Sequence, residues 1–170
     1  MEAKQAIGYL WAAQEFVKWK TLYKDNFLTH LFMMPDADLK GEWQIGYYSP
    51  HTEMMTSFFL NFDDRGQTVI EISPETEVFK KEEDQIRELD TKKILVDYDE
   101  AMSIANDIMT KEYPKEPIMK RVVILQVLEE GQLWNITFVS QAFATINVKV
   151  SSETGKIIRH DKKSLISFDK

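Results

Sequence analysis

Three histidines are the side chains best suited to binding a metal ion in this sequence of 170 residues. His30, His51 and His160 lie far apart, and only two of them have an acidic residue close by, Glu53 and Asp161. A metal site requires three or four ligands that the local structure can bring together. Single acidic neighbours do not provide such a set, so we expect no metal site.

Asp63 and Asp64 are adjacent carboxylates, which general acid/base catalysis could use. Arg65 and Gly66 follow them, and this composition is typical of a tight turn. The sequence has no phosphate-binding or nucleophile motif, and it has no cysteine for thiol chemistry. We therefore expect no catalytic residue and no cofactor, and a hydrolase or isomerase with a carboxylate base is the least favoured function.

The composition favours a folded, soluble chain. Apolar residues make up 44% of it, enough for a core in one domain or two small ones. The net charge of −7 argues against nucleic acid as a partner, because phosphate backbones attract basic surfaces. No apolar run approaches the ~20 residues of a membrane span. We expect a cytoplasmic protein, although a leader or anchor removed from the chain is compatible with this pattern.

The first half of the chain predicts a helix followed by four antiparallel strands. Apolar residues recur at helical spacing over residues 2–28, from Tyr9 to Phe27. Alternating apolar residues separated by turn signals then indicate strands at residues 28–34, 42–49, 54–62 and 67–73. A charged segment at 74–93 has mixed signs and is typical of a solvated surface connector.

The second half repeats this order. Helical spacing over residues 97–113 predicts a helix, and Asp97 and Glu100 have the spacing of a capping box at its start. Strands are predicted at residues 120–130, 133–140, 143–151 and 156–160.

Four landmarks recur in order between the halves at an offset of about 90 positions. The strand WQIGYYS, which begins at Trp43, and the strand WNITFVS, which begins at Trp134, both read Trp-x-Ile-x-aromatic-x-Ser. The other pairs are Tyr23 with Tyr113, Ser49 with Ser140, and Gly66 with Gly155. We therefore predict an α+β fold of two tandem helix-plus-four-stranded antiparallel sheet units packed together, with residues 1–80 and 96–170 joined by a connector at 81–95.

The second unit resembles a PepSY domain. The resemblance covers residues 97–160 and rests on DEAMSIA at 99–105 and NVKVSSETGKII at 147–158. Ser151 or Ser152 replaces the usual aspartate before the turn, and the first unit matches only in outline. The tandem layout is similar to that of beta-lactamase inhibitor protein, whose disulfides have no counterpart here. The resemblance implies a cystatin-like helix and sheet and a role in binding proteins or regulating proteases.

Apolar residues occupy both faces of the strands in the first unit, which indicates that both faces are covered. The cover could be the second unit, a homodimer mate or a protein partner. We expect non-enzymatic binding through a methionine-rich and aromatic surface, with a purely structural homodimer and a carrier of a small apolar ligand, held between helix 2–28 and the sheet, as alternatives. The candidate partner surface consists of Met33, Met34, Tyr47, Tyr48, Met54, Met55 and Phe59.

Overall fold

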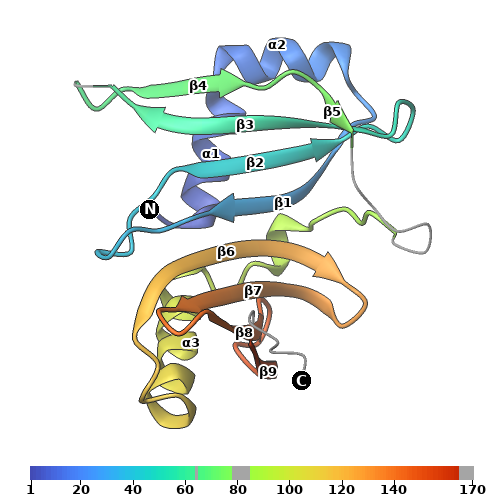
Figure 1. Ribbon diagram of the computed structural model, residues 1–170. Coiled ribbons are helices and arrows are strands. Elements are labelled where there is room, and N and C mark those ends of the chain that lie inside the picture. Colours follow the sequence, from blue (N-terminus) through green and yellow to red (C-terminus); the bar gives the residue numbers. More distant parts are fainter. Residues whose placement is uncertain (64, 78–84, 165–170) are drawn as a thin grey trace.

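The computed structural model describes residues 1–63, 65–77 and 85–164 (Figure 1). Asp64, one of the two adjacent carboxylates, lies outside these ranges, as do residues 78–84 of the predicted connector and the last residues, 165–170. The described chain has an α+β fold in which every strand belongs to one antiparallel sheet.

Two helices begin the chain, where the sequence predicted one. Helix α1 spans Ala3–Ala12 and helix α2 spans Gln14–Leu22, and between them Ala13 takes extended dihedral angles of φ −74° and ψ 136°. The prediction of one continuous helix was therefore wrong. The break also changes the buried side chains, because Tyr9 is 39% exposed, whereas the residues buried on the two helices are Ala3, Ala6, Ile7, Leu10, Phe16 and Trp19.

Five strands follow in the first half: β1 at Phe27–Met33, β2 at Trp43–Tyr48, β3 at Met54–Phe62, β4 at Thr68–Ile72 and β5 at Thr76–Glu77. The four predicted strands are confirmed to within one residue at each end. Strand β5 is additional and pairs with the start of β3, in a segment that the sequence assigned to the connector.

The second half begins with a short 3-10 helix, η1, at Thr91–Lys93. Helix α3 spans Tyr98–Glu112. Asp97 is its N-cap residue, as predicted, and the Asp97 carboxylate accepts a hydrogen bond from the Tyr98 amide. The four strands that follow are β6 at Ile118–Leu128, β7 at Gly131–Ser140, β8 at Ala144–Ser151 and β9 at Ile157–Ser164.

The two halves share one sheet, which has nine strands within the described residues. The strand order is β4-β3-β2-β1-β6-β7-β8-β9, and β5 lies on β3. Strand β1 pairs with β6 in the middle of this order, where Leu31 lies opposite Leu125 and Phe32 opposite Ile124. The halves therefore join edge to edge through backbone hydrogen bonds, and not only by packing apolar surfaces together as the sequence suggested.

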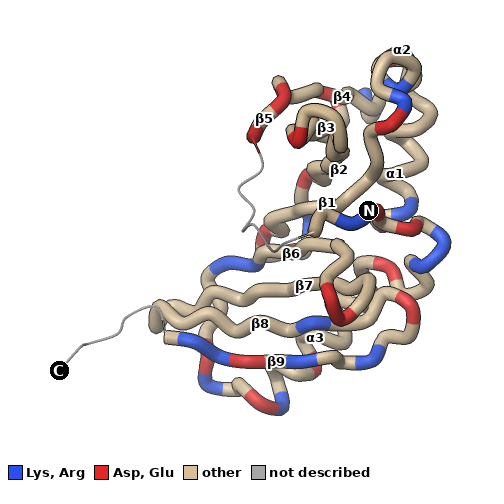
Figure 2. Tube along the Cα trace, turned by 90° about the vertical axis from the view of Figure 1, so that its right-hand side faces the viewer, with Lys and Arg blue, Asp and Glu red and all other residues tan. Residues whose placement is uncertain are grey.

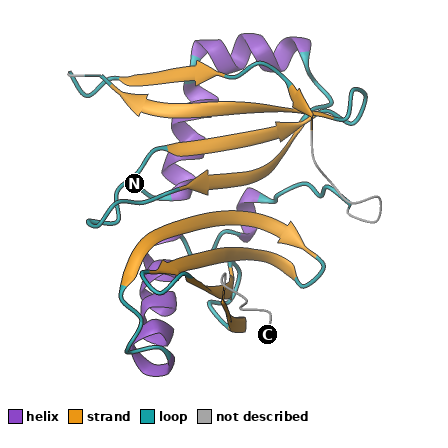
Figure 3. Cartoon of the chain, in the orientation of Figure 1, coloured by secondary structure: helices purple, strands orange, loops and turns teal. Residues whose placement is uncertain are grey.

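Helices α1, α2 and α3 lie on the same face of the sheet (Figures 1 and 3). The main core fills the space between the helices and the sheet and is continuous across the junction of the halves. Trp43 from the first half lies 6.3 Å from Trp134 of the second, between ring centroids, and 5.5 Å from Tyr98. The two tryptophans that matched in the sequence thus meet in one core.

Candidate functional site

The face of the sheet opposite the helices, here called the open face, is the first candidate site. Side chains alternate along each strand, so the residues paired with each other across the strands share a face. One row of such residues crosses eight strands on the open face. It consists of Glu71, Phe59, Gln44, Phe32, Ile124, Asn135, Lys149 and Arg159.

The middle of this row is apolar and partly accessible. Phe59, Phe32 and Ile124 are each half-buried, and Gln44 separates the two phenylalanines. Strands β1, β2, β3 and β7 contain no lysine, arginine, aspartate or glutamate, whereas β9, the helices and the loops are rich in charge (Figure 2). The neighbouring strands β4 and β6 contribute Glu71, which lies beside Phe59, and Lys120 and Arg121 near the start of β6. The strip formed by β1, β2 and β3 can therefore meet an apolar surface at a low cost of desolvating charge, with Glu71 and Arg87 at its borders.

The far end of the open face is polar. Asn147 on β8 donates through Nδ2 to Asn135 Oδ1 at 2.6 Å and to Thr137 Oγ1 at 2.9 Å, both on β7. Lys149 forms an ion pair with Glu130 at 2.6 Å. These side chains satisfy one another, which leaves the apolar end as the part of this face with more to gain from a partner.

The structure divides the predicted partner surface between the two faces. Met33 and Tyr47 lie on the helix side and are 2% and 3% exposed, so they belong to the core. Tyr48, Met55 and Phe59 lie on the open face, where Met55 pairs with Tyr48 and Phe59 with Gln44. Tyr48 is buried, and Met55 and Phe59 are half-buried. Met34 lies just beyond the end of β1 and is 49% exposed, and Met54 is half-buried at the start of β3.

His30 lies on the open face directly over the backbone of Gly46. A Cβ atom added at Gly46 would come within 2.1 Å of the imidazole Cε1. Thr29 Oγ1 donates to the Gly46 carbonyl at 3.1 Å and shares a 2.8 Å hydrogen bond with His30 Nδ1. Burial lowers the pKa of His30 below its usual value of 6.5, so the imidazole is neutral at neutral pH.

The other histidines lie elsewhere. His51 Nε2 is 2.9 Å from the Asp25 carboxylate, and both side chains are more than 70% exposed. His160 Nδ1 shares a 2.8 Å hydrogen bond with the Tyr113 hydroxyl. Within residues 1–63, 65–77 and 85–164, no three histidine or carboxylate side chains are arranged to hold a metal ion.

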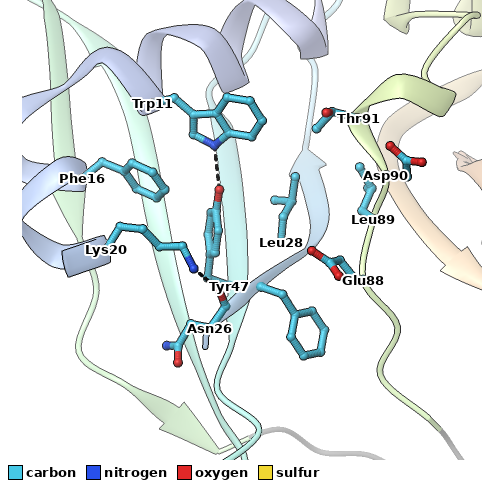
Figure 4. A pocket seen from close by; sticks show the side chains of 11 residues that line it. Trp11, Phe16, Lys20, Asn26, Leu28, Tyr47, Glu88, Leu89, Asp90 and Thr91 are labelled. Carbon is cyan, nitrogen blue, oxygen red and sulfur yellow. Dashed lines mark hydrogen bonds between the residues drawn. The ribbon is translucent and has the colours of Figure 1, made fainter. Parts of the chain in front are cut away.

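A cavity on the helix side is the second candidate site (Figure 4). Its volume is about 530 Å³, and it lies between the two N-terminal helices, β1 and the segment that leads into η1. The residues that line it are Trp11, Phe16, Lys20, Asn26, Phe27, Leu28, Tyr47, Glu88, Leu89, Asp90 and Thr91.

Tyr47 and Trp11 form the polar contact inside this cavity. The Trp11 indole nitrogen donates to the Tyr47 hydroxyl oxygen at 2.8 Å. Burial raises the pKa of Tyr47 to about 12, the Trp11 hydrogen bond opposes this shift, and the charge of Glu88 adds to it. The phenol is therefore protonated at neutral pH.

The alternative of a small-ligand carrier placed the ligand between the first helix and the sheet, but it did not identify the residues that line this cavity. Trp11 lies outside the apolar stripe that predicts a helix over residues 2–28. An aromatic residue outside that stripe was the available sequence signal for a residue that lines the cavity. Asn26 and Glu88 carry no such signal. Glu88 reaches the cavity because the segment that follows residue 84 returns to β1, where the Leu89 amide donates to the Leu28 carbonyl at 2.8 Å.

Comparison with known proteins identifies a shared fold. No family model and no curated protein matches the sequence. A crystal structure of a "putative lipoprotein" from Clostridium difficile 630 is similar, with a TM-score of 0.53 over 88% of this chain and 90% of that one. The two sequences are 15% identical, so the likeness shows the fold alone. Among the described residues, no helix has the length and apolar character needed to cross a bilayer.

Proposed function

We propose that this protein is a non-enzymatic binding protein that holds another protein against the open face of its sheet. The observation that carries the proposal is the cluster of Phe59, Phe32 and Ile124 at the middle of that face. All three are half-buried, and the strand register places them on the face opposite the buried core residues. Apolar surface removed from water stabilises a complex by about 25 cal/mol per Å².

Strands β1, β2 and β3, which contain no charged residue, support a protein partner further. Cores of protein interfaces are depleted in charged residues and rich in aromatic residues and methionine. Phe59, Phe32 and Met55 fit this composition. The resemblance of residues 97–160 to PepSY domains favours a protease or its precursor as the partner, and we include this in the proposal.

The test compares two substitutions on the same face of the sheet. Phe59→Asp places a charge in the apolar cluster, and Thr137→Asp places the same charge at the polar end. Each purified protein is immobilised, exposed to a panel of purified endoproteases of the four mechanistic classes, and assayed for binding and for inhibition of peptide cleavage. We expect one class to bind the wild type and the Thr137→Asp variant, and to bind Phe59→Asp at least about tenfold more weakly, the loss of ~1.4 kcal/mol.

Two results would overturn the proposal. One is binding that Phe59→Asp leaves unchanged, because the partner would then use another surface. The other is a wild-type dimer in sedimentation velocity that Phe59→Asp converts to monomer while no protease binds. In that case the open face would be a structural homodimer interface.

We also propose that residues 1–80 and 96–170 are two copies of one PepSY-like unit. The side-chain hydrogen bonds of the matched tryptophans support this. Trp43 Nε1 donates to the Met1 carbonyl at 3.0 Å, and Trp134 Nε1 donates to the Val96 carbonyl at 2.9 Å. Each acceptor lies two residues before the first residue of a helix, α1 or α3.

The equivalent positions at the helix ends support the same proposal. Tyr23 and Tyr113 are C-cap residues of α2 and α3, and each amide donates to the carbonyl four residues earlier at 3.0 Å. Gly66 and Gly155 both have positive φ, 73° and 68°. Sequence profiles built separately from homologues of each half should align with each other at these positions, and a failure to align above unrelated α+β domains would contradict common origin.

A further inference from the structure

The cavity beside Tyr47 lies on the opposite side of the sheet from the surface proposed to bind protein. Its volume of about 530 Å³ is within the range of about 300–1,000 Å³ that small-molecule sites occupy. The aromatic and aliphatic side chains of Trp11, Phe16, Leu28 and Leu89 contribute to its walls. Such a cavity favours a ligand with a mostly apolar body.

The Tyr47 hydroxyl makes only half of its hydrogen bonds. Its oxygen accepts from the Trp11 indole, and its own hydrogen has no acceptor within the described parts of the chain. Tyr47 is 3% exposed, and in Figure 4 its hydroxyl lies at the centre of the group of side chains that line the cavity. A buried donor without an acceptor is unfavourable, so this hydroxyl is poised to donate to a ligand atom.

Asn26 lies at the edge of the same cavity, and its side-chain amide points away from the Tyr47 hydroxyl (Figure 4). Its side-chain nitrogen is buried without a partner within the described ranges, and the residue is 4% exposed. The Lys20 ammonium group donates to the main-chain carbonyls of Asn26 and Lys24, which holds the Asn26 backbone at the cavity wall. The Tyr47 hydroxyl is therefore the unused donor that faces the apolar space, and Asn26 contributes its backbone to the wall.

The charges around the cavity exclude an anion as the preferred ligand. Glu88 and Asp90 are exposed side chains of the lining, and the Lys20 ammonium group is already bound by two carbonyl oxygens. An anionic headgroup near Tyr47 would face the same negative charge of Glu88 that contributes to the raised pKa of this tyrosine. A neutral acceptor avoids this repulsion.

We propose that this cavity binds a neutral, largely apolar small molecule that carries a carbonyl oxygen, and that this oxygen accepts the hydrogen bond of the Tyr47 hydroxyl. The Trp11 indole orients the hydroxyl by occupying its acceptor side, so the hydrogen of the phenol is left for the ligand. The site is independent of the open face and of any protein bound there.

The test uses two probes of nearly the same shape. 2-Acetylnaphthalene carries a carbonyl oxygen, and 2-isopropenylnaphthalene has a methylene group in its place. Binding to the full-length protein is followed by the nitrogen-15 NMR signal of the Trp11 indole. We expect the wild type to bind the ketone about tenfold more tightly than the hydrocarbon, which is the effect of one net hydrogen bond.

Tyr47→Phe should reduce the affinity for the ketone to that for the hydrocarbon and leave the hydrocarbon affinity unchanged. The matched control is Tyr48→Phe, which removes the hydroxyl of the next residue, on the other face of the same strand, and should preserve the preference for the ketone. Equal affinity of the wild type for both probes would overturn the proposal, and so would the absence of binding by either. The wild-type comparison decides the matter even if Tyr47→Phe does not fold.

Discussion

Asp97 is the residue that ties the two halves together at the scale of single side chains. Its carboxylate accepts hydrogen bonds from the Tyr98 amide of α3 at 2.7 Å and from the Ala3 and Lys4 amides of α1 at 2.8 and 3.2 Å. The first amides of a helix have no partner within the helix, so one carboxylate here satisfies the starts of two.

Glu2 completes this arrangement from the other side. It is the N-cap residue of α1, and its carboxylate accepts from the Asp99 amide of α3 at 3.4 Å. Burial raises the pKa of Glu2 from 4.5 to about 7, and hydrogen bonding to Asp97 and repulsion by Asp97 and Asp99 add to the shift. Folding therefore favours the protonated form of Glu2.

A stability loss between pH 4.5 and pH 7 follows from this shift. The stabilisation that protonated Glu2 adds to the folded state is fully present below the pKa of this side chain in the unfolded chain. It is lost as the pH rises through its pKa of about 7 in the folded protein. Glu2→Gln should match the wild type at pH 4 and exceed it at pH 8 by about 1 kcal/mol, a figure reduced because the side chain is only partly buried. Urea denaturation at the two pH values measures this, and a constant difference between variant and wild type would contradict it.

At the scale of elements, the contact between β1 and β2 depends on a glycine, Gly46. Thr29 is an extra residue in β1. Leu28 pairs with Tyr47, and His30, two residues later, pairs with Gly46, which directly precedes Tyr47 in β2. The bulge brings the His30 ring over the Gly46 backbone, where no Cβ atom fits.

Gly46→Ala should destabilise the fold by about 2 kcal/mol through overpacking. The same substitution in a His30→Ala background should cost far less, because the space that the ring occupied is then free, and the double-mutant cycle measures this coupling. The control is Gly8→Ala in α1, where nothing lies within 4 Å of the added methyl group, and it should stabilise by about 0.5–1 kcal/mol. Equal costs of Gly46→Ala in both backgrounds would contradict the role of His30.

At the scale of the whole molecule, we expect the two halves to unfold as one cooperative structure. They share the β1–β6 ladder and a core in which Trp43 and Trp134 lie near each other. Leu125 is fully buried at this junction, opposite Leu31. The loss of a buried contact here should therefore be felt on both sides of the ladder.

Leu125→Ala should lower the free energy of unfolding by about 3 kcal/mol, the usual cost of a cavity at a buried leucine. Hydrogen exchange should then show equal losses of protection for the amides of β2 in the first half and β7 in the second. Met119→Ala on the same strand should leave protection unchanged, because Met119 is 60% exposed. Loss of protection confined to the second half would show that the halves unfold separately.

Local sequence patterns account for most of the secondary structure. The predicted strands of the first half are correct within one residue, and Asp97 is the predicted N-cap, because alternation and capping are properties of short segments. The break at Ala13 had no glycine or proline to indicate it. It is associated with the Trp11–Tyr47 contact, whose partners lie far apart in the sequence.

The sequence by itself indicated most of the strands and the helix that follows Asp97, and it indicated that apolar residues occupy both faces of the first four strands. Only the tertiary structure decided what lies on each face. Tyr47 and Tyr48 are adjacent in the chain, yet one lies in the core and the other on the open face. The reason is that pairing of β1 with β6 extends the sheet sideways, so the second half continues the first and does not cover it.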